Sequence, residues 1–595
     1  MPAKYVLGID LGTTNSVVAY AALADEKPQV QVLAIPQLVA QGTVEARQSL
    51  PSFLYLAPEH EAAAGNLDLP WAGKRDFAVG ELARRQAADM PESTVGAAKS
   101  WLAHSRVDRH QPILPWGAAA DKPKVSPVTA SRRYLEHLIA AWEAAFPDAP
   151  VAEQMVVVTV PASFDASARE LTREAALAAG LPEGFLLLEE PQAAVYAWLD
   201  SYGEKWRRLL KVGETLLVCD VGGGTTDLTL VNVDQEGGEL VLRRLAVGNH
   251  LLVGGDNMDL ALAHHASQLF AEKGVNLDPW QSVSLWHSCR NAKETLLAPG
   301  GPKKHSITIA GRGSRLIAKS VSIEVERDAT ADLFIEGFFP KCGLSDKPAR
   351  RRASGFQEIG LPFESDTAIT RHLAAFLSAH GDSQRGPVRP THLLLNGGVF
   401  KSDRLGARLL EVLGEWFPGP QAPQLLAGHH DLENAVARGA AAYGWAKLHR
   451  GIRIRGGTAR SYYVGIESAG LAVPGAPRPL RALCVVPIGM EEGTETDVPS
   501  GEIGLVVGEP AQFRFFNSST RKEDQPGALL PSATGDDLVE SDSLETTLPA
   551  DEGIDEPYVP VKFHSKITEL GMFELWCYSP KTQKRWKLEF SVREE

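Results

Sequence analysis

Cysteine is scarce and scattered in this chain of 595 residues. The five cysteines are odd in number and form no C-x-x-C pair; they are Cys219, Cys289, Cys342, Cys484 and Cys577. A disulfide framework or a zinc site needs cysteines at close, regular spacings. The sequence therefore predicts reduced thiols, as in a cytosolic protein.

Long apolar runs are also missing. No stretch approaches the roughly 18 consecutive apolar residues that a membrane-spanning helix requires. The N-terminus enters a strand pattern at Tyr5, without the basic segment and apolar core of a secretion signal. These absences predict a cytoplasmic protein that has no membrane partner.

An excess of positive charge is absent as well. The chain has 60 Lys and Arg against 74 Asp and Glu, which gives a net charge of −14. Because binding of nucleic acid depends on a basic surface, we do not expect nucleic acid as a partner.

The most informative stretch that is present is Leu216–Leu230, with the sequence LLVCDVGGGTTDLTL. Apolar, β-branched flanks on both sides of the glycines predict a strand, a tight turn and a second strand. Glycines at such a turn let backbone N–H groups come close to an anion. Threonine hydroxyls can donate to phosphate oxygens, and the acids Asp220 and Asp227 can hold a cation.

The same order of residues occurs once more near the N-terminus, in VLGIDLGTTNSVVAY from Val6 to Tyr20. Asp10, Gly12, Thr13 and Thr14 repeat the acid, glycine and hydroxyl positions. Asp10 and Asp220 are 210 positions apart, and a repeat at this distance indicates two similar lobes rather than short repeat units. Two such turns that face each other would hold a polyphosphate and its Mg²⁺ from both sides.

Two other nucleotide-binding motifs are excluded. The sequence contains no G-x-x-x-x-G-K-[ST], so it has no P-loop, and neither glycine turn opens into a helix as a dinucleotide-binding fingerprint requires.

Two charged residues have open interpretations on local grounds. Lys99 lies in GAAKSWL, a small-residue helical context, where a lone lysine is usually a solvated surface group. Glu190 follows a strand and precedes Pro191, so it either points into a crevice or belongs to a helix N-terminus.

The chain divides into three parts by composition. Residues 1–447 alternate strand and helix patterns, which predicts an α/β domain. Residues 448–460 include the basic, glycine-containing RGIRIRGGTAR and are interpreted as a linker. Residues 461–595 show short strands and turn signals, which predicts an all-β domain.

Six motifs together resemble the 70-kDa heat-shock chaperones, the DnaK-type branch of the actin/hexokinase-like ATPases. They are VLGIDLGTTNSVVAY, VVVTVPASFD, LLEEPQAAVYAW, LLVCDVGGGTTDLTL, VGGDNMD and LLLNGGV, in the family's order. The resemblance implies a two-lobed ATPase domain followed by a β-sandwich, substrate-binding-like domain. SYYVGIES and ELGMFELWCYSPKTQKRWKLEFSV resemble the first strand and the last hairpin of that sandwich.

The resemblance also implies roles for individual residues. Asp10 and Asp220 would order Mg²⁺, and Lys99, Glu190, Asp227 and Thr225 would be catalytic. The nucleotide would be bound by Gly12, Thr13, Thr14, Gly222, Gly223, Gly224, Gly254, Gly255, Lys293, Gly397, Gly398 and Lys401. The implied cofactors are ATP or ADP with Mg²⁺, and K⁺ as an optional cation. Pro161, Arg169 and Glu190 match the family's switch between domains.

Several positions depart from the family. Arg290 stands where the base-side helix carries an acid, Glu294 where a basic residue is common, and Leu297 where a serine is expected. Lys401 replaces an arginine that stacks on the base. These changes predict intact binding of the phosphates and altered recognition of the base. The basic linker also differs from the family's acidic, leucine-rich linker, which docks as a strand.

The implied function is ATP-dependent binding of unfolded or apolar polypeptide segments, with slow hydrolysis and with J-domain and nucleotide-exchange co-chaperones as partners. The sequence runs to Glu595 directly after the last β hairpin, so we expect a member without the helical lid and with fast peptide exchange. Two alternatives stay open: a nucleotide-gated scaffold or regulator with little turnover, and a small-molecule kinase of the same superfold.

Overall fold

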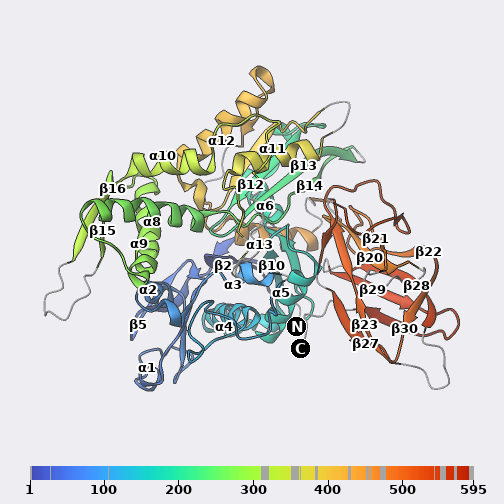
Figure 1. The fold of residues 1–595 in the computed structure, drawn as a ribbon, viewed down its shortest axis with the longest axis horizontal. Coiled ribbons are helices and arrows are strands. Elements are labelled where there is room, and N and C mark those ends of the chain that lie inside the picture. Colours follow the sequence, from blue (N-terminus) through green and yellow to red (C-terminus); the bar gives the residue numbers. More distant parts are fainter. Residues whose placement is uncertain are drawn as a thin grey trace.

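The computed structural model describes residues 3–588 apart from 27–28, 105, 237, 310–319, 350–360, 362, 382–385, 427–430, 450–453, 456, 469–477, 536, 542, 550–557 and 569–571. Two lobes stand one above the other, and a β domain lies at their side (Figure 1). Residues 450–453 and 456 of the predicted linker fall outside the described residues.

Lobe I is built on a mixed sheet with the strand order β11-β10-β1-β2-β3, and β6 pairs with β2. Its strands are β1 (Tyr5–Leu11), β2 (Asn15–Ala22), β3 (Gln31–Val32), β6 (Leu50–Pro51), β10 (Met155–Val160) and β11 (Leu186–Glu189). β1 and β2 form the first predicted hairpin, in which Asp10 lies opposite Val17.

Lobe II repeats this order as β18-β17-β12-β13-β14, with β19 added at the edge. Its strands are β12 (Thr215–Val221), β13 (Thr226–Glu236), β14 (Glu239–Val247), β17 (His392–Asn396), β18 (Gln424–Leu425) and β19 (Ile454–Arg455). In each lobe an antiparallel hairpin is extended by parallel strands, β10 on β1 and β17 on β12. The predicted repeat of lobes is therefore confirmed.

Helices cover the sheets and form the surfaces between the lobes. They are α1 (Glu59–Ala63), α2 (Glu81–Asp89), α3 (Ala98–Leu102), α4 (Pro127–Ala145), α5 (Ala166–Ala178), α6 (Glu190–Tyr202), α7 (Trp206–Leu209), α8 (Gly255–Glu272), α9 (Pro279–Leu297), α10 (Arg327–Phe338), α11 (Ile369–Ala379), α12 (Asp403–Trp416) and α13 (Ala435–Leu448). Smaller strands complete the two lobes: β4 (Ile35–Ala40), β5 (Thr43–Arg47), β7 (Leu54–Leu56), β8 (Phe77–Val79), β9 (Thr94–Val95), β15 (Lys304–Ile309) and β16 (Val321–Glu326).

α6 and α13 join the two lobes through a shared core. This core contains residues from β1, β10, β12, β17 and both helices, including Val157, Val218 and Ala440. The two helices approach so closely that a Cβ on Gly439 would lie 1.7 Å from the carbonyl oxygen of Ala193. Small residues at this crossing therefore allow the lobes to sit on one common support.

The β domain has a first strand, β20, that begins at Ser461. Its strands are β20 (Ser461–Glu467), β21 (Leu480–Val486), β22 (Glu495–Val506), β23 (Pro510–Phe513), β24 (Phe515–Ser518), β25 (Leu529–Leu530), β26 (Val539–Glu540), β27 (Leu544–Thr547), β28 (Tyr558–Ile567), β29 (Phe573–Tyr578) and β30 (Arg585–Leu588). They form the sheets β25-β21-β20-β24-β26 and β22-β28-β29-β30, with β23 paired to β27. No helix occurs among the residues described beyond Leu448.

The linker contributes a strand to lobe II. Ile454 and Arg455 form β19, which pairs in parallel with Leu242 and Arg243 of β14. The side chain of Arg244 also donates to the carbonyl oxygen of Gly457. A basic composition therefore does not prevent this linker from docking as a strand, because the backbone supplies the pairing groups.

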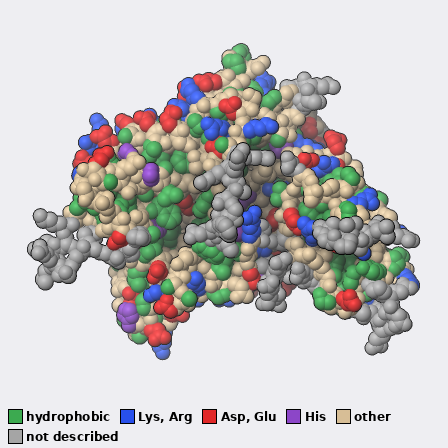
Figure 2. Space-filling model, viewed as in Figure 1, with side chains coloured by type: hydrophobic (Ala, Val, Ile, Leu, Met, Phe, Trp, Pro, Cys, Tyr) green, Lys and Arg blue, Asp and Glu red, His purple; other side chains and the backbone are tan. Residues whose placement is uncertain are grey.

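Charged side chains of both signs are interspersed on the face of the molecule shown in Figure 2. Within the described ranges, no helix combines the length and the hydrophobicity needed to cross a bilayer.

Candidate functional site

The two glycine turns face each other across the space between the lobes. A Cβ on Gly223 would lie 1.8 Å from the Thr14 hydroxyl oxygen, and one on Gly224 would lie 3.0 Å from the Thr13 methyl group. Only a residue without a side chain permits this approach. The structure thus brings together the two turns that the sequence placed in separate lobes.

A cavity of about 440 Å³ lies at these turns. Sixteen of the residues predicted for the site line it: Asp10, Gly12, Thr13, Thr14, Lys99, Glu190, Asp220, Gly222, Gly223, Thr225, Asp227, Gly255, Lys293, Gly397, Gly398 and Lys401. Gly224 and Gly254 do not line the cavity. Gly254 instead packs beneath the central turn, where a Cβ would lie 2.7 Å from the carbonyl oxygens of Gly222 and Gly223.

Asp10 and Asp220 sit at the ends of the equivalent strands β1 and β12. Burial, followed by the negative charge of Glu190, raises the pKa of Asp10 to about 7 and that of Asp220 to about 8. Asn396 donates to Asp220 over 2.7 Å, and Thr159 donates to Asp10 over 3.2 Å. The positive charge around these two carboxyl groups is too small to favour their ionised forms strongly at neutral pH.

Lys99 is buried in α3, with 5% of its surface exposed, and forms an ion pair with Glu190. The surface interpretation of this lysine is therefore wrong. Glu190 is the first residue of α6 and also lines the cavity, so both interpretations of its position hold. Burial raises the pKa of Glu190, while the charge of Lys99 lowers it.

Asp227 lies opposite Asp220 in the β12–β13 pair. The Ser163 hydroxyl forms a hydrogen bond of 2.6 Å with Asp227 and one of 2.7 Å with Nδ1 of His250. Burial lowers the pKa of His250 to about 4, so its ring is neutral. Ser163 thus fixes the position of the Asp227 carboxylate from outside the cavity.

Gly397 closes the strand end beside Asp220. Its φ of +89° belongs to the left-handed region, and a Cβ there would lie 2.2 Å from the carbonyl oxygen of Val221. Any other residue would strain the backbone and push apart β12 and the turn after β17.

The far end of the cavity carries the residues that depart from the family pattern. Arg290 donates to Asp256 over 2.7 Å and to Asp259 over 2.8 Å, and Lys293 pairs with Asp259 at 2.6 Å. Arg290 therefore ties α9 to the start of α8.

Two of the remaining departures, Lys401 and Glu294, form ion pairs with nearby residues. Lys401 forms an ion pair with Glu433, and Glu294 pairs with Arg84 of α2 at 3.2 Å across the opening between the lobes. Leu297 lines the cavity, as does Ala298.

The carboxylate set fits a divalent cation that arrives with phosphates. Oxygen ligands suit Mg²⁺, which usually takes one or two carboxylates together with substrate phosphates and water. Asp10, Glu190, Asp220 and Asp227 are concentrated around one lysine, and added positive charge would favour their ionised forms. Among the described residues, no three His, Cys, Asp or Glu side chains converge into a closed metal site.

Sequence reasoning missed several residues of the site. Ser163 and His250 have no local motif that marks them. Asn396 could have been identified from the sequence, because it is a polar residue at the end of an apolar strand, directly before Gly397. This position places it at the sheet edge where Asp220 also lies. Glu81, Arg84 and Glu433 also line the cavity.

Comparison with known proteins agrees with this architecture. A family model described as Hsp70 protein matches residues 71–334. The chaperone protein HscA homolog of Shewanella sp. (strain MR-7) is 28% identical over 358 residues, which cover 57% of this chain and 48% of the relative. The chaperone protein DnaK of Stenotrophomonas maltophilia (strain R551-3) is 26% identical over 430 residues, which cover 69% of this chain and 61% of the relative.

The chain thus spans about half to three fifths of the length of these two relatives. Together with the repeated sheets and the β domain, these matches confirm the predicted fold class: a two-lobed, actin-like ATPase domain followed by a β domain.

Proposed function

We propose that the chain is a member of the 70-kDa heat-shock protein family, to which it is similar, and that it is an ATP-dependent chaperone that binds apolar polypeptide segments. The observation that carries the proposal is the approach of the two glycine turns, Gly223 to Thr14, above four carboxylates and one buried lysine. This arrangement suits a polyphosphate better than any other common ligand.

In this proposal the turns bind the phosphates. Backbone N–H groups of Gly12 and Gly223 and the hydroxyls of Thr13, Thr14 and Thr225 would donate to phosphate oxygens. The N–H of Gly222 donates to the carbonyl oxygen of Thr225 over 2.9 Å, so Gly222 would shape the turn that faces the phosphates. Asp10 and Asp220 would hold Mg²⁺, which neutralises the phosphate charge when bound. Gly255, Lys293, Gly398 and Lys401 would contact the rest of the nucleotide from the far end of the cavity.

Hydrolysis would depend on positioning and charge rather than on covalent catalysis. Lys99 would donate to the terminal phosphate, where negative charge develops in the transition state. Glu190 and Asp227 would orient the attacking water, with Asp227 held in place by Ser163. Removal of Lys99 should therefore lower the rate of the chemical step more than the affinity for nucleotide.

Coupling to the β domain would run through the linker strand. β19 pairs with β14 at the edge of the lobe II sheet, and Arg244 connects Gly457 to Glu189 at the end of β11. Glu189 directly precedes Glu190, so a change at the nucleotide can alter the position of the linker over a short distance. As part of this proposal, the ATPase domain ends at residue 447, the linker spans residues 448–460, and the β domain begins at residue 461.

Release of a fluorescent apolar peptide from the full chain, with and without MgATP, tests the chaperone function. We expect MgATP to accelerate release from the wild type. The Ile454→Asp variant should still hydrolyse ATP but lose the acceleration, because an aspartate at this position, 8% exposed in the docked strand, opposes docking. Absence of peptide binding under both conditions would contradict the chaperone function and favour a nucleotide-gated scaffold.

A further inference from the structure

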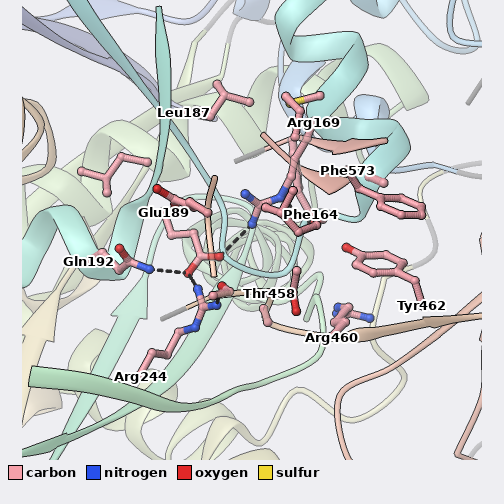
Figure 3. Close-up of a pocket in the computed structure, with 17 residues that line it drawn as sticks. Phe164, Arg169, Leu187, Glu189, Gln192, Arg244, Thr458, Arg460, Tyr462 and Phe573 are labelled. Atoms are coloured by element: carbon pink, nitrogen blue, oxygen red, sulfur yellow. Dashed lines mark hydrogen bonds and ion pairs between the residues drawn. The ribbon is translucent and has the colours of Figure 1, made fainter. Parts of the chain in front are cut away.

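A second, smaller cavity of about 50 Å³ lies where lobe I, the end of the linker and the β domain meet. Figure 3 shows Arg169 and Glu189 of lobe I, Arg460 of the linker, and Tyr462 and Phe573 of the β domain around it. The nucleotide site does not share any of these residues. Its lining holds three arginines, Arg169, Arg244 and Arg460, but two carboxyl groups, Glu189 and Glu492.

Glu189 is fully engaged by two of these arginines. Its Oε1 accepts from Arg169 over 2.8 Å, and its Oε2 accepts from Arg244 and, over 3.1 Å, from Gln192. Burial raises the pKa of Glu189, but the charges of Arg244 and Arg169 outweigh burial and hold it below its ordinary value. The single negative charge of Glu189 is therefore already shared between Arg169 and Arg244 and does not balance the third arginine.

Arg460 is a buried cation that forms no ion pair with a carboxylate of the described residues, although the charges of Asp165 and Asp227 act on it from a greater distance. It is 6% exposed, and its two hydrogen bonds go to neutral groups, the Asn517 side chain and the carbonyl oxygen of Ser163, the latter over 3.4 Å. Its Nε is buried and finds no acceptor in the part of the chain that the structure describes. A guanidinium has five N–H donors, so this group has more donors than the surrounding residues satisfy. A buried charge in this condition destabilises the structure unless something compensates it.

Tyr462 adds a further donor. Its side chain is 8% exposed and stacks on Phe573 with ring centroids 5.3 Å apart. Figure 3 shows its hydroxyl directed toward the middle of the cavity, and no residue that the structure describes accepts a hydrogen bond from it. Glu492, the other carboxyl group of the lining, is exposed to solvent, and within the described residues it forms no ion pair with Arg460.

We propose that this interdomain cavity binds a small oxyanion of the phosphate class, held by Arg460, Arg169 and the Tyr462 hydroxyl. A single water needs only about 10–15 Å³ on the same measure, so a cavity of about 50 Å³ has room for a small inorganic oxyanion but not for a nucleotide. Charge-assisted bonds to an oxyanion are the strongest that these donors can form.

The bound anion would stabilise the docked arrangement of the domains. Its donors come from lobe I, the linker and the β domain, so all three must be in place to bind it. Anything that binds the docked form alone shifts the equilibrium toward it. The concentration of free phosphate would therefore affect how firmly the β domain is held, independently of nucleotide.

Calorimetric titration of inorganic phosphate into the full chain tests this proposal. The titration is made with a saturating nonhydrolysable ATP analogue and Mg²⁺, so that phosphate cannot bind between the glycine turns. We expect one site in the wild type, at least tenfold weaker binding in Arg460→Met, and partial recovery in Arg460→Lys. Arg481→Met, an exposed arginine of the β domain, is the matched control and should bind as the wild type does.

Tyr462→Phe keeps the ring stack on Phe573 and removes only the hydroxyl, so it tests the site even if Arg460→Met disturbs folding. We expect it to bind phosphate severalfold more weakly. No phosphate binding by the wild type would mean that water fills the cavity, and equal binding by all variants would place the anion elsewhere. Either result overturns the proposal. If the analogue itself fails to bind, the nucleotide proposal fails, whereas the comparison of variants still decides this one.

Discussion

The ion-pair cluster of Arg290, Asp256, Asp259 and Lys293 offers a sharp test of the energetics of the site. Asp259 has no exposed surface, and the Arg290 side chain is 10% exposed. Substitution of Arg290 by methionine keeps much of the side-chain volume and removes the charge. Asp259 then retains Lys293 alone, and Asp256 loses its ion-pair partner.

The expected cost follows from these contacts. Two charges about 4 Å apart attract by about 4 kcal/mol at an effective dielectric constant of about 20. Removal of one partner from a buried ion pair typically costs about 3–5 kcal/mol, because the other charge stays buried without compensation. We therefore expect Arg290→Met to destabilise the contact between α8 and α9 by about 3–5 kcal/mol. Removal of Asp259 as well should recover about 2 kcal/mol or more of the sum of the two single effects.

Hydrogen exchange of the amides in α8 and α9 is the appropriate assay, because a chain with several domains does not unfold in one step. The predicted cost corresponds to about two to four orders of magnitude less protection in these helices. Arg404→Met, which removes an exposed ion pair with Asp332, should leave protection unchanged. Similar protection in Arg290→Met and the wild type, or additive effects in the double variant, would refute the reasoning.

Three further predictions concern other parts of the chain. Burial lowers the pKa of His137 to about 4. As the pH falls from about 6.5 to 4, this histidine is therefore protonated in the unfolded chain but stays neutral in the folded chain. Stability should fall by up to about 3 kcal/mol over this range, and His137→Gln, which can keep the bond to Pro36, should remove this part of the pH dependence in denaturant titrations. Gly223→Ala places a methyl group against Thr14 and should abolish detectable nucleotide binding in calorimetry, whereas unchanged affinity would show that the turns do not meet as described. Arg244→Met removes the side-chain contact with the linker and should speed proteolysis of the linker severalfold in the nucleotide-bound protein; equal cleavage rates would show that this contact does not hold the linker.

Much of the phosphate-binding end could be predicted from the sequence because its determinants are local. A glycine turn between apolar strands fixes both the backbone conformation and the position of the acid before it, and Asp10 and Asp220 show the same pattern twice. The equal strand order of the two sheets follows from that repeat. Lys99 could not be placed in this way, because nothing in GAAKSWL distinguishes a buried lysine from an exposed one.

The far end of the cavity depends on tertiary packing. The sequence shows Arg290 only as a departure from the family pattern on the base-side helix. Its partners Asp256 and Asp259 precede it by 34 and 31 positions and meet it only when α8 packs on α9. Ser163 reaches Asp227 and His250 across still longer separations of 64 and 87 positions. The basic composition of the linker did not indicate a strand. Ile454 pairs with Leu242 through backbone groups, and the charge of the side chains gives no information about such pairing.

The most direct test of the central proposal is single-turnover hydrolysis of ATP in the presence of Mg²⁺ by the purified chain, beside Lys99→Met and the exposed control Lys122→Met. The proposal predicts that all three proteins bind the nucleotide and that Lys122→Met hydrolyses it as the wild type does. Hydrolysis by Lys99→Met should be slower by about two orders of magnitude or more, which is the usual effect of losing one stabilising donor in the transition state. A wild type that binds no nucleotide, or a Lys99→Met variant that hydrolyses ATP at the wild-type rate, would contradict it.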